Sequence, residues 1–195
     1  SQTAGLTAEQ RRRLGDLQDE ALDYLIQVFT EDESNTAQDV FGFLAGIGGD
    51  RYANRVLRRL ADTYVTQGRH ERAVEAYQLL LVRNPTVPEA PEYQRTIALS
   101  YARMGETDQV VTALDTLART YGPESAWATQ QGDPEVVAAA QRRIERAVRR
   151  QALKFHEQAQ RDNDRALFER TARLYAVYQA NFSGDEHAYE LRFYE

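Results

Sequence analysis

The sequence contains no cysteine in its 195 residues. Disulfide bonds and thiolate metal sites are therefore excluded, because both need cysteine sulfur. The absence does not fix the compartment, since a cysteine-free chain suits the bacterial periplasm and the cytosol equally.

Long apolar runs are also missing. The longest apolar cluster, Val40 to Ile47, is broken by Gly42 and Gly46, whereas a membrane-spanning helix needs roughly 18 consecutive apolar residues. No signal-peptide pattern opens the chain. With 42% hydrophobic and 28% charged residues, the composition is that of a folded domain. We expect neither a disordered chain nor a transmembrane segment.

Methionine occurs only once, at Met104, so residue 1 is not a translation start. At the other end, the segment 188–195 lacks a glycine or proline that would stop a helix. It reads as a truncated last helix that begins near Asp185. Both ends predict a piece of a longer protein.

A basic excess is absent, because the net charge is −6. The charge is uneven: residues 1–50 hold 3 basic and 10 acidic side chains, and residues 51–100 hold 8 and 5. Dedicated nucleic-acid-binding proteins usually carry a basic excess. The balance therefore favours a chain with no nucleic-acid partner.

No segment alternates between apolar and polar residues over the length of a strand, so we expect an all-α fold. Thr7 with Gln10 predicts a capping box at the first helix, and Asp133 before Pro134 predicts the start of a long one. Residues 122–133, which include Trp127, read as an irregular connection. The expected helices cover about 7–31, 36–47, 51–67, 70–83, 89–104, 107–121 and 134–161, and a further helix lies between the turn at Asn163-Asp164 and Ser183-Gly184.

Two of these helical stretches repeat each other at one spacing of 37 residues. A fixed period of this size is typical of stacked helical hairpins, each too small to bury its own apolar face. The matched pairs are Tyr64 and Tyr101, Gly68 and Gly105, and Ala73 and Val110.

Residues 54–87 resemble the tetratricopeptide repeat, a helix–turn–helix unit of about 34 residues. The positions that carry the resemblance are Leu57, Leu60, Ala61, Tyr64, Gly68, Ala73, Tyr77, Leu80 and Pro85. The resemblance implies a right-handed α-solenoid of such hairpins over residues 51–195, with units at about 54–87, 91–124 and 134–183. Residues 1–50 are expected to form an N-terminal helical pair, either a cap or the helices of a preceding repeat.

The segment from Tyr64 to Ala73, with the linker Pro85 to Pro91, is similar to the corresponding segments of bacterial cell-envelope members of the family. This resemblance implies a periplasmic or envelope-associated protein, with the cytoplasm as the alternative. It also implies a scaffold or adaptor that helps to assemble a multiprotein machine for secretion, motility or envelope maintenance. The alternative is a structural spacer or oligomerisation module without a peptide ligand.

Groups for catalysis are scarce. The histidines His70, His156 and His187 are far apart in sequence, and His156-Glu157 lacks the second histidine of a zinc-protease motif. The glycine-rich stretch 46–50 has no preceding strand and no following Gly-Lys-Ser or Gly-Lys-Thr, so we interpret it as a helix stop. We expect no catalytic residue, no cofactor, no metal site and no enzymatic activity.

The family resemblance implies a concave surface lined by the first helix of each repeat, which binds a protein or peptide partner. Several arginines on one inner face can hold an acidic peptide through bidentate hydrogen bonds. Since the chain has 23 arginines and one lysine, solvated arginines are the alternative. The candidate groove residues are Arg55, Arg58, Asp62, Arg95, Leu99 and Arg103.

Two further features have a structural and a functional reading. A basic stripe on the helix that follows Pro134, from Arg142 to Arg150, is expected to be a solvated face, although an anionic lipid or nucleic acid is the alternative. Trp127, in the irregular connection, either anchors that loop or contacts a partner.

Overall fold

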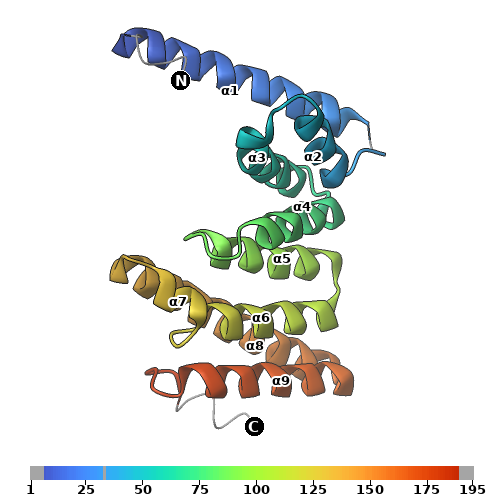
Figure 1. Cartoon of the computed structure of the whole chain (residues 1–195). Helices are drawn as coiled ribbons and strands as arrows, with labels where there is room; N and C mark the ends of the chain where they lie inside the picture. Colours follow the sequence, from blue (N-terminus) through green and yellow to red (C-terminus); the bar gives the residue numbers. More distant parts are fainter. Residues whose placement is uncertain (1–6, 33, 189–195) are drawn as a thin grey trace.

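The computed structural model describes residues 7–32 and 34–188, and over this part of the chain the fold is all-α, as predicted. Figure 1 shows the helices stacked one below another from the N-terminal to the C-terminal end. The helices are α1 Ala8–Glu31, α2 Ala37–Gly46, α3 Ala53–Thr66, α4 His70–Arg83, α5 Ala90–Met104, α6 Thr107–Tyr121, α7 Ala126–Gln130, α8 Pro134–Asp162 and α9 Arg165–Phe182, with a short 3₁₀ helix at Asp50–Tyr52.

The helix starts predicted at Thr7 and Asp133 are confirmed. The Gln10 amide donates to the Thr7 hydroxyl at 3.2 Å, and the Thr7 amide donates to the Gln10 side chain at 2.8 Å. The Asp133 carboxylate accepts from the Glu135 amide at 2.9 Å, directly before α8. These contacts satisfy amides that have no partner inside the helix, which is why the sequence marks both starts clearly.

The core of the first repeat lies between α3 and α4. Leu57, Leu60 and Ala73 are fully buried there, and Tyr64 is 1% exposed. Ala73 lets the two helices approach closely, and the tyrosine fills the space beside that contact. Gly68 turns the chain between the helices with φ +73°, a backbone conformation that side chains disfavour.

The same packing continues down the stack. Helix α4 packs on α5, α5 on α6, and α8 on α9, while α6 contacts both α8 and α9. The turn between α5 and α6 uses Gly105 with φ +78°, the counterpart of Gly68 37 residues earlier. The all-α helical repeat fold is thus confirmed, whereas the division into an N-terminal pair and three units stays a prediction.

The prediction of an irregular connection at 122–133 is wrong, because the five-residue helix α7 lies within it. Ser125 caps this helix, and Trp127 is 3% exposed. The indole Nε1 donates to the Val87 carbonyl at 2.9 Å, and the ring packs edge-on against Tyr121. Trp127 therefore anchors the connection, and its reading as a partner contact is wrong.

At the C-terminal end, α8 runs for 29 residues, ends one residue beyond the predicted end at about 161, and packs on α9. The truncated last helix expected from near Asp185 lies mostly in residues 189–195, outside the described residues. Within the described ranges 7–32 and 34–188, no helix combines the length and apolar character needed to span a bilayer.

Candidate partner-binding groove

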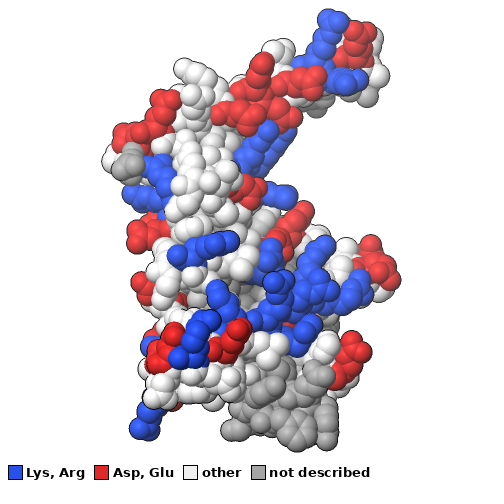
Figure 2. Space-filling model, turned by 180° about the vertical axis from the view of Figure 1, so that it is seen from behind, with Lys and Arg blue, Asp and Glu red and all other residues white. Residues whose placement is uncertain are grey.

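A groove of about 1150 Å³ lies between α5 and α8, with α6 at its base. Figure 2 shows Lys and Arg side chains gathered on this rear face, below the middle of the molecule. We call this surface the basic groove. Its basic side chains are Arg95, Arg103, Arg143, Arg146, Arg150 and Lys154.

One carboxylate, Glu92, faces these six cations among the residues that line the groove. Arg95 already binds it, with its Nε 2.8 Å from a Glu92 carboxylate oxygen. That contact holds the pKa of the Arg95 guanidinium above its usual value. The basic groove thus carries a strong positive charge in a protein whose net charge is −6.

Apolar atoms form the floor of the basic groove. Val110 and Leu114 of α6 lie beneath it and are only 1% and 3% exposed, whereas Leu99 of α5 is 47% exposed between the arginines. The basic groove therefore combines two kinds of contact on one surface. The partly exposed leucine offers an apolar contact, and the surrounding cations offer charge-assisted hydrogen bonds.

The cations of the basic groove differ in how they are held. On α5, Arg95 is tied to Glu92, whereas Arg103 is given no ion pair among the described residues. On α8, the structure gives no ion pair to Arg143, Arg146, Arg150 or Lys154 within residues 7–32 and 34–188. These α8 side chains are therefore available to an anionic group that enters the groove.

The basic stripe predicted on α8 is divided between two faces. Arg143, Arg146 and Arg150 line the groove, whereas Arg149 points elsewhere and its Nε donates to Glu145 at 2.6 Å. Glu145 is 9% exposed and also accepts from the Tyr178 hydroxyl at 2.9 Å. Arg149 thus neutralises a buried carboxylate of its own helix, and the Tyr178 hydroxyl joins that carboxylate to α9.

The structure places half of the sequence-predicted groove residues in the basic groove. Arg95, Leu99 and Arg103 line it. The three residues of the first repeat, Arg55, Arg58 and Asp62, do not line it.

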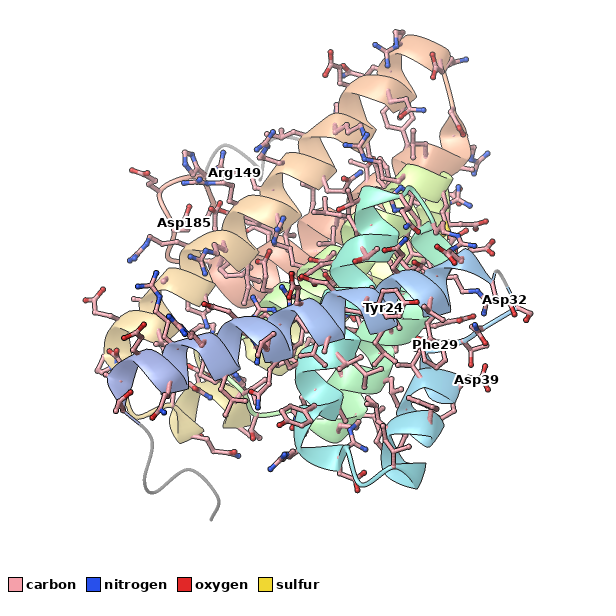
Figure 3. All side chains as sticks on the ribbon, turned by 90° about the horizontal axis from the view of Figure 1, so that it is seen from above. Tyr24, Phe29, Asp32, Asp39, Arg149 and Asp185 are labelled. Atoms are coloured by element: carbon pink, nitrogen blue, oxygen red, sulfur yellow. The ribbon has the colours of Figure 1, made fainter. Side chains whose placement is uncertain are left out.

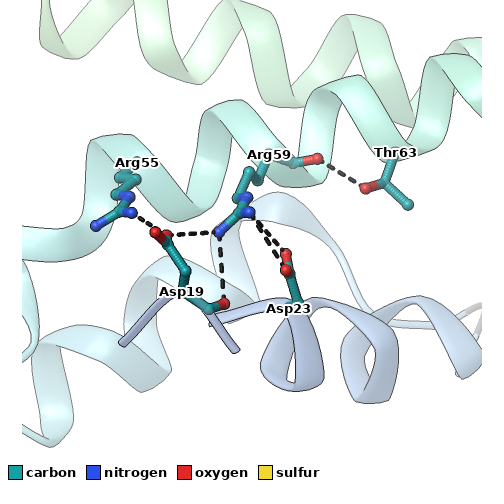
Figure 4. Close-up of polar contacts among 5 residues, drawn as sticks. All are labelled: Asp19, Asp23, Arg55, Arg59 and Thr63. Atoms are coloured by element: carbon teal, nitrogen blue, oxygen red, sulfur yellow. Dashed lines mark hydrogen bonds and ion pairs between the residues drawn. The ribbon is translucent and has the colours of Figure 1, made fainter. Parts of the chain in front are cut away.

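Arg55 lies at an internal interface with α1. Its guanidinium forms an ion pair with Asp19, and Arg59 bridges Asp19 and Asp23 at 3.0 and 3.2 Å (Figure 4). These pairs join residues 36 to 40 positions apart and fasten the acidic first helix to α3. Sequence reasoning missed Asp19, Asp23 and Arg59, although the acidic excess of residues 1–50 beside the basic excess of residues 51–100 was a signal for them.

Asp62 accepts a hydrogen bond from the Tyr77 hydroxyl of α4. Burial of the ring, together with this bond and the Asp62 charge, raises the pKa of Tyr77. The Tyr77 ring packs against Tyr93 with centroids 5.6 Å apart, and Arg58 lies beside the Tyr93 hydroxyl. Asp62 and Arg58 thus belong to a contact between α3, α4 and α5.

A second acidic residue is held by arginines away from the basic groove. Asp108 of α6 accepts from Arg170 and Arg173 of α9, both at 2.6 Å. These two hydrogen bonds lower the pKa of Asp108 to about 2. The two contacts tie α9 to α6.

The histidines lie in separate surroundings. His156 packs edge-on against Phe168 with ring centroids 5.8 Å apart, and His187 lies 3.6 Å from the Glu186 carboxylate. In the described part of the chain, no group of three or more potential metal ligands comes together. The expectations of no metal, no cofactor and no catalysis stay predictions.

Comparison with known proteins identifies one segment. The family model of the tetratricopeptide repeat matches residues 55–86, which span α3, α4 and the start of the proline-rich linker. No curated protein and no solved structure matches the chain. The predicted second and third units lie outside the matched segment and stay predictions. Residues 55–86 thus match the tetratricopeptide repeat, the family that the sequence predicted for 54–87, within an all-α helical repeat fold.

Proposed function

We propose that this chain is a protein–protein interaction scaffold whose basic groove binds an acidic segment of a partner protein. Tetratricopeptide repeats generally mediate protein–protein interactions and are typically non-enzymatic. The observation that carries the proposal is the basic groove itself: six cations and one carboxylate around a floor that exposes Leu99.

The chemistry of the groove defines the segment that fits. Glutamate or aspartate side chains bind the guanidinium groups of α8, with bidentate geometry where the planes align. An apolar side chain between two acidic residues contacts Leu99, the exposed apolar side chain of the groove. An acidic segment with interspersed leucines meets both needs, whereas a uniformly acidic chain leaves the floor unfilled.

The cellular role that we propose is assembly of a multiprotein machine in the bacterial envelope. This role is supported by the similarity of the segment from Tyr64 to Ala73 to envelope members of the family. A periplasmic or envelope-associated location goes with this role, and the partner is a protein rather than a nucleic acid.

The test is a fluorescence anisotropy titration with a labelled peptide of twelve residues. In this peptide, glutamate residues alternate with leucine or alanine residues. We expect binding that weakens as salt rises, because added ions screen the charges. Reversal of two α8 cations, Arg143→Glu with Arg150→Glu, lowers affinity at least about tenfold.

The matched control is Arg161→Glu with Arg165→Glu, at the end of α8 and the start of α9, where the side chains are 66% and 94% exposed. It changes net charge equally but lies outside the basic groove, so affinity stays within about twofold of the wild type. Equal loss in both variants contradicts a specific groove. Tighter binding of an oligonucleotide than of the peptide contradicts a protein partner.

A further inference from the structure

A second cavity continues the basic groove toward the N-terminal ends of α5 and α8. Its volume is about 510 Å³, and it shares Glu92, Arg95 and Arg143 with the basic groove. The ion pair between Arg95 and Glu92 therefore lies where the two cavities join. We call this cavity the end pocket; its apolar lining residues are Pro88, Pro91, Val136, Ala139, Ala140 and Ile144.

Small side chains leave the end pocket open. Ala139 and Ala140 line it from α8, and Pro91, in the first turn of α5, lines it from the other helix. Ala140 is 5% and Ile144 1% exposed, so the floor belongs to the protein core, whereas Val136 and Ala139 are partly exposed. The end pocket thus offers apolar surface to a side chain that enters from outside.

The end pocket uses one face of α8, the face that carries Ala140 and Arg143. Arg149 follows Ala140 by nine residues, which is two and a half turns of helix, so it lies on the opposite face. Figure 3 shows Arg149 near Asp185 at the edge of the molecule. The ion pair of Arg149 with Glu145 is therefore separate from the end pocket.

Helix α7 fixes the linker that forms one wall of the end pocket. This linker joins α4 to α5 and contributes Pro88 to the lining. Just before Pro88, the Val87 carbonyl accepts from the Trp127 indole at 2.9 Å, and the Thr86 carbonyl accepts from the Gln131 side chain at 3.0 Å. A wall that is already held in place lowers the entropic cost of binding a side chain against it.

The sign of the charge changes between the basic groove and the end pocket. Of the described residues that line the end pocket, two are basic, Arg95 and Arg143, and both lie at the junction with the basic groove. Four are acidic. An acidic segment that follows the basic groove is repelled by these carboxylates, so its acidic run ends at the junction. The acidic lining residues are Glu89, Glu92, Asp133 and Glu135.

We propose that the end pocket binds a bulky apolar side chain, such as phenylalanine, at the end of the partner's acidic segment. The inference rests on the proposed function, because the same segment occupies the basic groove. A side chain held in this pocket beside Arg95 and Arg143 fixes the register of the segment, which the row of cations alone does not fix. Trp127 and Gln131 are positioning residues that act through the linker.

The test extends the labelled acidic peptide by one phenylalanine or by one alanine, at its N-terminal or its C-terminal end. One of the two phenylalanine peptides binds at least about fivefold tighter than its alanine counterpart, because the pocket removes the ring from water. Ala139→Phe fills the end pocket and abolishes this preference. The alanine peptide still binds to that variant, which shows that the variant is folded.

Two further variants complete the test. Ala138→Phe is the matched control: it is the same change one residue earlier, at a partly exposed position outside the lining of the end pocket, and it keeps the wild-type preference. Gln131→Ala releases the linker, so it reduces the preference for phenylalanine without weakening the alanine peptide. An unchanged preference in Gln131→Ala overturns the positioning role of α7.

The outcomes separate this inference from the proposed function. Equal binding of the phenylalanine and alanine peptides to the wild-type chain overturns the inference and leaves the acidic groove ligand intact. A preference that persists in Ala139→Phe places the ring elsewhere and overturns it as well. If none of the peptides binds, the proposed function is contradicted and the inference falls with it.

Discussion

Two arginine-rich regions of this molecule use the same side chain differently. On α3, Arg55 and Arg59 face carboxylates of α1 and fasten two helices together. On α8, Arg143, Arg146 and Arg150 line an open groove, and the structure gives none of the three an ion pair within its described residues. An arginine on an inner helix therefore marks a binding surface only where the fold leaves it without an acidic neighbour.

The largest expected effect is a loss of stability when a core residue of the first repeat is truncated. Leu57→Ala removes a fully buried side chain from the core of the first repeat, and we expect the free energy of unfolding to fall by about 2–5 kcal/mol. Urea denaturation measures it. The half-exposed Leu99 is the matched position in the other region, where Leu99→Ala costs less than about 1 kcal/mol. Similar losses at both positions contradict the distinction between core and groove.

A smaller effect separates the two sets of arginines. Arg59→Ala removes the bridge to Asp19 and Asp23, and we expect a loss of stability of about 1 kcal/mol or less, since these side chains are partly exposed. Arg146→Ala leaves stability unchanged or slightly raised, because it relieves repulsion among the groove cations. Chemical denaturation of the two variants side by side checks this order, and a larger loss in Arg146→Ala runs against it.

The smallest effect concerns Asp108, an arginine-bound carboxylate in the half of the molecule that holds the groove. Its pKa is lowered in the folded state to about 2 from an ordinary value of 3.8. A lowered pKa means that the contribution to stability is present above pH 4 and is lost as the pH falls toward 2.

Asp108→Asn should therefore be less stable than the wild type at pH 5, and the difference should shrink between pH 4 and pH 2. Thermal melting of both proteins across that range measures it. A difference that stays constant with pH means that Arg170 and Arg173 do not act on the Asp108 charge.

Local signals in the sequence predicted most of the fold. Thr7 and Asp133 mark helix starts through contacts only two or three residues away, and Gly68 marks a turn through its own backbone angle. Helix α7 was missed because its five residues are held by a contact from Trp127 to Val87, 40 positions earlier. Contacts at that separation leave no periodic pattern in the sequence.

The candidate site was predicted in part for the same reason. Arg95, Leu99 and Arg103 were expected from the family resemblance, which implies a concave surface on the first helix of each repeat, and they line the groove. The wall contributed by α8 depends on how that helix packs beside α5 and α6, a long-range outcome. The ion pairs of Arg55 and Arg59 with α1 equally depend on the fold, so the sequence pattern alone did not separate the two regions.

The central claim is that partner binding belongs to the groove between α5 and α8 and not to the arginines of the first repeat. The direct measurement is the affinity of the acidic peptide for two neutralised variants, Arg143→Gln with Arg150→Gln and Arg55→Gln with Arg58→Gln. Both variants remove two positive charges, one pair from α8 and one pair from α3. The account predicts a loss of at least about fivefold for the α8 pair and less than twofold for the α3 pair. A greater loss for the α3 pair contradicts it.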